Sequence, residues 1–134
     1  MDELIPEIHQ YLVERGWDQL RPTDIAKSVS IEANELLELF QWGSLTIEET
    51  KADAERLQKV RGEVADVLIY CLEMCDALDL SPNEIVREKL EHARKKYPVE
   101  LIQSWKQSTD GGGKAYEEYK REMRGKKNDA TSPE

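Results

Sequence analysis

Apolar residues recur at helical spacing along most of the chain, and no segment shows the apolar–polar alternation of a half-buried strand. Pro22 suits the first turn of a helix, and Thr46 and Ser81 each precede a glutamate by three residues, which is the capping-box spacing. Gly16 and Pro98 mark places where helices usually end. The sequence therefore predicts an all-α fold.

These signals predict four helical regions, over about residues 2–15, 22–41, 46–79 and 82–96. Gly62 is a candidate break in the third region. A Gly-rich joint, a short charged helix near 115–124 and a flexible polar tail are expected to follow. Since 134 residues suit a single domain, we expect a helical bundle built around a four-helix core over 1–110 and an appendage over 111–134.

The charge of the chain excludes several classes of partner. A formal net charge of −9 argues against a nucleic-acid groove or an anionic membrane surface, both of which need clustered Lys and Arg. No apolar run approaches the roughly 20 residues that span a bilayer, and the N-terminus lacks the order of a signal peptide. A cytoplasmic protein is expected, and an anionic ligand would require positive charge from another source.

Two pairs of acidic residues occupy unusual positions in the predicted helices. At about 100° per residue, Glu32 falls inside the apolar stripe of the helix over 22–41, Glu35 lies at the edge of the stripe and Glu38 points farther out. Glu63 and Asp66 lie on the single polar stripe of a helix that is otherwise mostly apolar. These carboxylates are predicted on or beside buried faces.

Buried carboxylates cost several kcal/mol each unless they are paired. Lys or Arg could satisfy one or two of them, but four that converge require more. Hard cations such as Mg²⁺ prefer carboxylate oxygens, and residues three apart share one helix face. Two facing helices could therefore present four carboxylates to one metal site, although Glu-x-x-Glu also occurs commonly on solvated helices, as Glu38 illustrates.

The order Glu-x-x-Glu, spacer, Glu-x-x-Asp resembles that of the MazG-like all-α nucleoside triphosphate pyrophosphohydrolases. The similarity runs from about Tyr11 to Pro98 and includes the strings "RGWDQLRP", "EANELLELFQW", "EVADVLIY" and "KLEHARKKYP". The strings "ELLELFQW" and "DVLIY" are most similar to the dCTP pyrophosphatase type. The chain is thus identified as a member of this superfamily on the basis of its motifs.

The resemblance implies hydrolysis of a nucleoside triphosphate to the monophosphate and pyrophosphate, with Mg²⁺ as cofactor. The implied metal ligands are Glu32, Glu35, Glu63 and Asp66, although Glu35 and Glu38 could instead form the first pair. Glu35 or Glu38 is the candidate that orients or deprotonates the attacking water. Mg²⁺ would explain how an acidic protein binds an anionic substrate.

Candidate substrate contacts follow from the same resemblance. Trp17 and Trp42 are expected to enclose the base and sugar, or else to pack in turns, and Tyr70 could reach the sugar or phosphate from one turn beyond Asp66. Lys89 and Lys96 are candidate phosphate partners, although basic residues near a helix C-terminus also favour the helix dipole.

One departure from the family weakens the prediction of substrate. The family often has Asn where this chain has Ala93, so an amide contact to the nucleotide is missing or is replaced by His92. His9 is one place out of register with the family and is interpreted as a surface residue. Relatives acting on dUTP or phosphoribosyl-ATP, and a non-catalytic helical adaptor, remain as alternatives. A homodimer or a dimer of dimers is implied.

Overall fold

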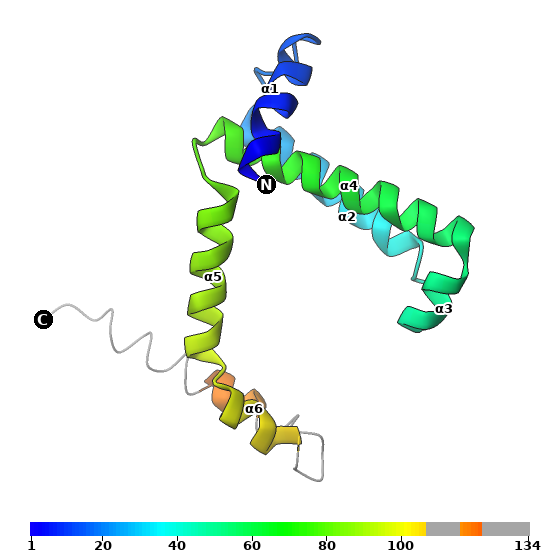
Figure 1. Ribbon diagram of the computed structural model, residues 1–134, viewed down its shortest axis with the longest axis vertical. Coiled ribbons are helices and arrows are strands. Elements are labelled where there is room, and N and C mark those ends of the chain that lie inside the picture. The colour runs from blue at the N-terminus through cyan, green and yellow to red at the C-terminus, as the bar shows by residue number, and fades with distance from the viewer. Residues whose placement is uncertain (107–115, 122–134) are drawn as a thin grey trace, which may run out of the picture. The chain divides into compact units, whose positions relative to one another are not determined.

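The computed structural model describes residues 1–106 and 116–121 of the chain (Figure 1). Helices account for all the regular secondary structure in these residues, and no strand occurs among them. The predicted all-α fold is therefore confirmed. The chain divides into two compact units, Met1–Val86 and Arg87–Glu134. The predicted domain boundary between residues 110 and 111 differs from this division. It stays a prediction of where the family domain ends.

The first unit contains a short 3-10 turn, four α-helices and the start of a fifth. They are η1 (Asp2–Leu4), α1 (Ile5–Val13), α2 (Pro22–Glu38), α3 (Ile47–Ala52), α4 (Ala54–Ala77) and the first turns of α5 (Pro82–Lys96). α2 packs along α4, while α1 and α3 contact α4 at separate places (Figure 1). The small core consists of Leu12, Ile25, Leu72 and Cys75. α4 is therefore the element on which this unit is assembled.

α1 and α2 are shorter than predicted because tight turns replace their last residues. After α1, Gly16 adopts a positive φ of 67°, which glycine tolerates without steric cost. The Trp17 amide then donates to the Leu12 carbonyl over 2.9 Å. After α2, the Phe40 amide donates to the Leu37 carbonyl and the Gly43 amide to the Phe40 carbonyl. Trp17 and Trp42 consequently lie in turns outside the helices.

The third predicted region is two helices, and its break lies at Asp53 rather than at Gly62. Asp53 is extended, with φ −89° and ψ 96°, and its carboxylate accepts a 2.9 Å hydrogen bond from the Arg56 amide. This is the capping role that Asp favours at a helix start. α4 runs through Gly62 without interruption, so the prediction of a break there was wrong. One glycine inside a helix costs only about 1 kcal/mol, and the packing of α4 against α2 offsets this cost.

The Asp2 carboxylate connects the start of the chain to the start of α5. It accepts hydrogen bonds from the Ser81 hydroxyl at 3.2 Å, the Asn83 amide at 3.2 Å and the Asn83 side chain at 2.8 Å. Burial alone would raise the pKa of Asp2, but the bonds from Asn83 and Ser81 outweigh it and lower that pKa. The Ser81 hydroxyl also caps α5 by accepting from the Glu84 amide, as the sequence predicted.

The second unit contains the rest of α5, α6 (Val99–Lys106) and the helical residues 116–121. The ring of Tyr97 lies 6.4 Å from that of Tyr116 and 5.9 Å from that of Tyr119, and the Tyr119 hydroxyl donates to the Lys96 carbonyl. The predicted stop near Pro98 is confirmed, but α6 was missed because a new helix begins at the next residue. The Gly-rich joint and the polar tail fall outside the described residues.

Within the described ranges, no helix combines the length and the apolar composition that crossing a bilayer requires.

Candidate active site

Three carboxylates from two packed helices converge in the first unit. Glu32 comes from α2, and Glu63 and Asp66 come from one face of α4. One oxygen of each lies within 4.8 Å of the others. The packing of α2 along α4 produces this convergence, because residues three apart on α4 face the same neighbouring helix. The sequence prediction that the two acidic pairs meet is thus realised for these three residues.

The charge of this cluster is not balanced by a cationic side chain within residues 1–106 and 116–121. Among the described residues, no Lys, Arg or His lies within ion-pair distance of Glu32, Glu63 or Asp66. Burial raises the pKa of Glu32, and the charges of Glu35, Asp66 and Glu63 raise it further. A bound cation, or a proton on Glu32, would relieve this repulsion.

A hard divalent cation fits the donor set. Mg²⁺ is held by oxygen ligands at about 2.0–2.1 Å in octahedral geometry, so oxygens bound to one ion lie roughly 3–4 Å apart. The observed upper limit of 4.8 Å among the three carboxylate oxygens requires only small side-chain adjustments to reach that spacing. The residues therefore suit a Mg²⁺ site.

Glu35 and Glu38 occupy different surroundings on α2. Both side chains are exposed. Glu35 lies near enough to Glu32 to raise the pKa of Glu32, whereas Glu38 lines a separate cavity with Trp42. The geometry therefore favours Glu32 and Glu35 over Glu35 and Glu38 as the first acidic pair. The catalytic roles of Glu35 and Glu38 stay predictions.

A largely apolar pocket of about 540 Å³ adjoins the carboxylates. Its walls come from η1, α1, Trp17 and α4, and Asp66 belongs both to this pocket and to the acidic cluster. Tyr11 and Trp17 meet edge to face, with ring centroids 6.2 Å apart, and Trp17 is 51% exposed. The pocket thus offers flat aromatic surfaces beside the candidate metal ligands.

Tyr70 and Glu73 continue the polar stripe of α4 into the same pocket. Burial raises the pKa of Tyr70, and the charges of Glu32 and Glu73 add to this effect, so Tyr70 lies between the cluster and Glu73. Glu73 is only 3% exposed. Sequence reasoning placed Tyr70 one turn beyond Asp66 but did not identify Glu73 or Tyr11 as site residues. Glu73 lies seven residues, or about two helical turns, after Asp66, and this spacing could have placed it on the same face of the helix.

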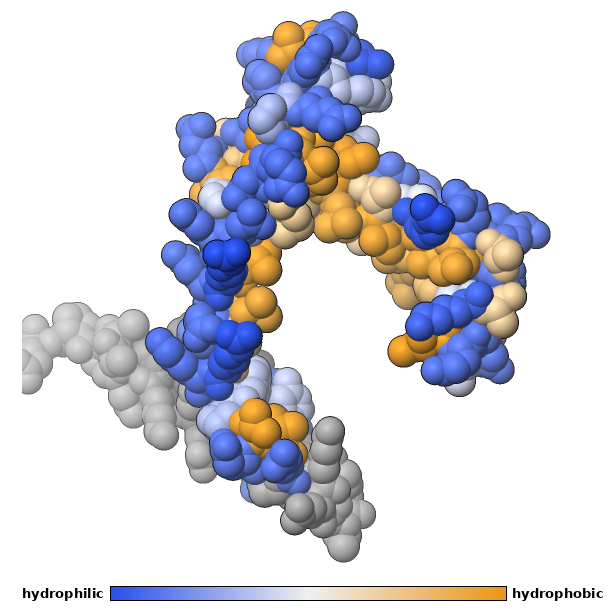
Figure 2. Space-filling model, viewed as in Figure 1, coloured by the Kyte–Doolittle hydropathy of each residue, from blue (hydrophilic) through white to orange (hydrophobic). Residues whose placement is uncertain are grey.

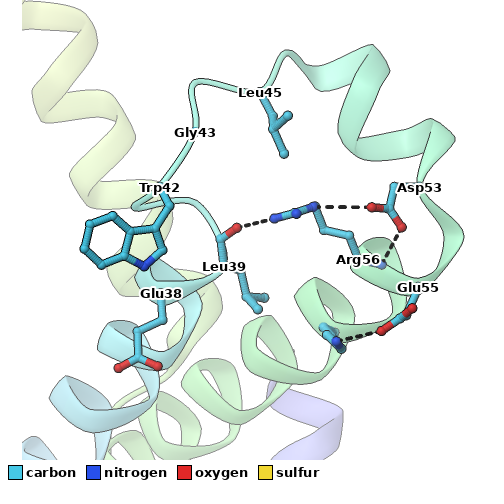
Figure 3. A pocket seen from close by; sticks show the side chains of 9 residues that line it. Glu38, Leu39, Trp42, Gly43, Leu45, Asp53, Glu55 and Arg56 are labelled. Carbon is cyan, nitrogen blue, oxygen red and sulfur yellow. Dashed lines mark hydrogen bonds and ion pairs between the residues drawn. The ribbon is translucent and has the colours of Figure 1, made fainter.

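A second cavity, of about 560 Å³, lies beside the turn after α2 (Figure 3). Arg56 crosses it, donating to the Leu39 carbonyl and lying 3.5 Å from the Asp53 carboxylate. Trp42 is 90% exposed at this cavity. Trp17 and Trp42 therefore line different cavities within the chain, and their predicted joint enclosure of a base stays untested. Sequence reasoning did not single out Arg56, which shows no periodic or motif signal.

Three further predicted or discussed residues are not among those that line either cavity. Lys89 and Lys96 belong to the second unit, where the Lys96 ammonium lies 5.2 Å from the centre of the Tyr97 ring. Their role as phosphate partners stays a prediction. His9, interpreted as a surface residue, is exposed and forms a 2.7 Å ion pair with Asp76. This pair links α1 to the last turn of α4.

The fold and the acidic cluster define an all-α protein that gathers carboxylates from two packed helices. The family model of the MazG-like family matches residues 27–110, and the chain belongs to this family. A pyrophosphatase from Archaeoglobus fulgidus DSM 4304 is similar in structure, with a TM-score of 0.65 and 41% sequence identity. That match covers 73% of this chain and 92% of the other.

The curated relatives are named dCTP pyrophosphatase 1. The protein from Mus musculus is 31% identical over 102 residues, which cover 74% of this chain and 60% of that protein. The protein from Homo sapiens is 29% identical over 113 residues, which cover 76% of this chain and 62% of that protein. The chain therefore spans less than two thirds of the length of these relatives.

Proposed function

We propose that the protein is a Mg²⁺-dependent nucleoside triphosphate pyrophosphohydrolase. It would convert a (deoxy)nucleoside triphosphate, dCTP-like or modified, to the monophosphate and pyrophosphate and so maintain the nucleotide pool. The convergence of Glu32, Glu63 and Asp66 without a described cationic partner carries this proposal. The names of the relatives, dCTP pyrophosphatase 1 and pyrophosphatase, support the reaction class.

Bound Mg²⁺ supplies positive charge that offsets the triphosphate and favours attack at phosphorus. Glu32, Glu63 and Asp66 would hold the ion, and Glu35 is the nearest further acid on α2. Because no described Lys or Arg competes for these oxygens, all the acceptor capacity of the cluster remains for the ion. Glu32 and Glu63 are half-buried and Asp66 is exposed, so an ion and its substrate could reach these oxygens from solvent.

The reaction needs a water molecule aligned with phosphorus and a group to accept its proton. Glu35 is exposed next to Glu32 and does not belong to the set of three converging oxygens. It therefore suits the role of general base, which requires a carboxylate beside the metal ligands but not fully committed to them. Glu38 lies one turn farther along α2, in the lining of the second cavity, and is the second candidate.

The pocket beside Asp66 is the proposed binding site for the nucleoside. Its apolar walls and the Tyr11–Trp17 pair suit a flat heteroaromatic base. Tyr70 lines this pocket, and the charge of Glu32 contributes to its raised pKa, so its hydroxyl is proposed to contact sugar or phosphate. Trp42, Lys89 and Lys96 are retained as proposed contacts to the base and to phosphate oxygens.

We further propose that the protein assembles as a homodimer or a dimer of dimers. Large apolar side chains remain exposed on both central helices, including Ile31 and Leu37 of α2 and Val64, Leu68 and Ile69 of α4. Orange surface along α4 in Figure 2 marks part of this region. Contiguous apolar surface of this kind is typical of protein interfaces. Light scattering coupled to size-exclusion chromatography tests the proposal, and a monomer would contradict it.

We also assign the protein to the cytoplasm. Cys71 and Cys75 are both free thiols, which suits a reducing compartment. Fractionation of cells that produce the protein, with a cytoplasmic marker followed in parallel, tests this assignment. Recovery with a membrane or secreted fraction would contradict it.

Turnover of a panel of nucleoside triphosphates tests the proposed reaction. The panel contains dCTP, dUTP, dATP, dGTP, the corresponding ribonucleotides, 5-substituted dCTP and phosphoribosyl-ATP, each with Mg²⁺. Monophosphate and pyrophosphate are followed together, for the wild type and for Glu35→Gln and Asp66→Asn. Equal release of both products, lost in folded variants, supports the proposal. No turnover of any compound by the wild type would favour a non-catalytic helical adaptor.

A further inference from the structure

The pocket between α1 and α4 contains a carboxyl group without a partner. Glu73 lines this pocket and is 3% exposed. In the described part of the chain, no residue donates a hydrogen bond to it or forms an ion pair with it. Burial raises the pKa of Glu73, and the charge of Asp76 raises it further. Arg56 Nε is the only fully buried side-chain N or O atom without a hydrogen-bond partner in the described part of the chain. The unpaired Glu73 oxygens therefore keep some accessible surface, and a ligand in the pocket can reach them.

Glu73 lies about two helical turns from the candidate metal ligand Asp66, which leaves room for a nucleotide between them. Asp66, Tyr70 and Glu73 follow one another on the same face of α4 and all line the pocket. Seven residues of α-helix correspond to a rise of roughly 10 Å. The pKa of Tyr70 responds to both Glu32 and Glu73, so the tyrosine bridges the two regions. A nucleotide with its phosphates beside Asp66 would therefore extend its base along α4 toward Glu73.

We propose that Glu73 determines base specificity by pairing with a base that carries an exocyclic amino group next to a ring nitrogen. This inference rests on the proposed function and names the class of substrate for it. The Tyr11 and Trp17 rings at the same pocket would cover the faces of such a base, while the Glu73 carboxyl meets its edge. Acceptance of a hydrogen bond from the amino group of cytosine is an established role of glutamate.

The chemistry of the edge explains why the carboxyl discriminates. With cytosine, the carboxyl accepts from the amino group and shares a proton with the adjacent ring nitrogen, which makes the pair charge-assisted. Uracil presents an N–H between two carbonyls. A protonated carboxyl can pair with this edge only through neutral hydrogen bonds. An ionised carboxylate can accept from the N–H, but its second oxygen is repelled by a uracil carbonyl oxygen. Charge-assisted bonds are roughly twice as strong as neutral ones. Glu73 should therefore favour dCTP over dUTP, which differ only at this edge.

Glu73→Gln tests the proposal because an amide keeps the size of the side chain and removes its acidity. By rotating, the amide makes two neutral bonds with either cytosine or uracil. The ratio of kcat/KM for dCTP to that for dUTP is expected to fall about tenfold, as the difference between charged and neutral hydrogen bonds predicts. Loss of dCTP turnover should cause most of the fall. An unchanged ratio, or a wild type that turns over both nucleotides equally well, would overturn the assignment.

Glu73→Leu separates recognition from packing. It removes an unpaired buried carboxyl, so the thermal midpoint should rise or stay the same while the preference for dCTP disappears. A lower midpoint with the preference retained would show a structural role and overturn the proposal. Glu48→Gln is the matched control, because Glu48 is an exposed acid on α3 outside both cavities. It should leave the ratio as in the wild type.

A binding measurement separates this proposal from the proposed function. The affinities of dCMP and dUMP are measured by calorimetry for the wild type and for Glu73→Gln. If the wild type hydrolyses no nucleotide but binds dCMP at least about tenfold more tightly than dUMP through Glu73, the base site stands and only the reaction fails. If the wild type hydrolyses nucleotides and Glu73→Gln changes neither ratio, the reaction stands and the base site fails.

Discussion

Two cavities described above have nearly the same volume, but they differ in whether their charged side chains have partners. The cavity beside the turn after α2 is lined by Arg56 and Lys59, and each is matched by an acid one turn earlier, Asp53 and Glu55 (Figure 3). The pocket between α1 and α4 is mostly apolar, yet its Glu73 is unmatched, and it adjoins three unmatched carboxylates. Glu38 also lines the first cavity, so the contrast concerns its two basic residues, which are both paired.

The contrast suggests a criterion for a binding site: charged side chains there lack partners of opposite charge within the protein, whereas charged side chains in structural contacts are already paired. Arg56 already donates to the Leu39 carbonyl and joins the end of α2 to the start of α4. The charges of Glu35, Asp66 and Glu63 disfavour the ionised form of Glu32, and a bound cation would offset this repulsion. A ligand therefore gains more at the acidic side, because it removes a cost that the protein alone carries.

The largest effect is expected from a substitution in the acidic cluster of Glu32, Glu63 and Asp66. Asp66→Asn should lower kcat/KM for the best nucleotide about 10³-fold, because it removes a charged oxygen that metal-assisted attack requires, a difference of several kcal/mol. The rise in thermal midpoint on adding Mg²⁺ should also shrink. Circular dichroism confirms folding of the variant. Full activity in a folded Asp66→Asn protein would remove the basis for treating the acidic side as the reactive one.

Arg56→Ala tests the cavity beside the turn after α2, where the basic residues are paired. Loss of the hydrogen bond to the Leu39 carbonyl and of the contact with Asp53 should lower the free energy of unfolding by about 1–2 kcal/mol, measured by urea denaturation. The kcat/KM of the folded fraction should change by less than about threefold, or under 1 kcal/mol. Arg56→Lys is the matched variant, since lysine keeps the charge but not the planar fork. A large increase in KM in both variants would show that this cavity binds substrate phosphate.

The pH dependence of stability sharpens the contrast further. In EDTA, Glu32 is neutral in both folded and unfolded chains at low pH and contributes no penalty. As the pH rises, the unfolded chain loses this proton first, because the folded pKa of Glu32 is raised. The metal-free protein should therefore lose stability from the ordinary glutamate range up to the raised pKa. Thermal midpoints measured across this range should show a weaker decline in Glu32→Gln, and an identical decline would contradict the repulsion.

The smallest effect is expected at Lys59. Its 2.8 Å pair with Glu55 is exposed and spans one helical turn, and such pairs contribute about 0.3–0.5 kcal/mol. Lys59→Ala should therefore lower the free energy of unfolding by no more than this amount, with kcat/KM unchanged. Salt titration of the wild type should reproduce the loss. A marked loss of nucleotide affinity would show that Lys59 has a second partner in the substrate.

Local sequence signals predicted the α5 start at Pro82 and the placement of Glu32, Glu63 and Asp66, because capping and helical periodicity depend on a few neighbouring residues. The all-α class followed from the same signals. The break at Asp53 was missed because Gly62 was weighed by propensity, whereas an N-cap hydrogen bond decided the outcome. α6 was missed because a proline that ends one helix also permits another to begin directly after it.

The site residues that sequence reasoning missed depend on tertiary contacts. Arg56 acquires its role from the Leu39 carbonyl, which lies 17 residues earlier in the chain. Tyr11 joins the pocket only because α1 contacts α4. The separation of Trp17 from Trp42 likewise depends on where the turns after α1 and α2 end, and no local pattern encodes those directions.

The contact between Asp2 and the start of α5 also orders events in time. It joins residues about 80 positions apart, so its formation must close a loop that contains α1 to α4. Such a contact forms late, after the helices that bring its ends together, and its opening need not disturb them. The backbone amide of Asn83 donates to the Asp2 carboxylate at 3.2 Å. Its hydrogen-exchange rate should therefore report how often this contact opens.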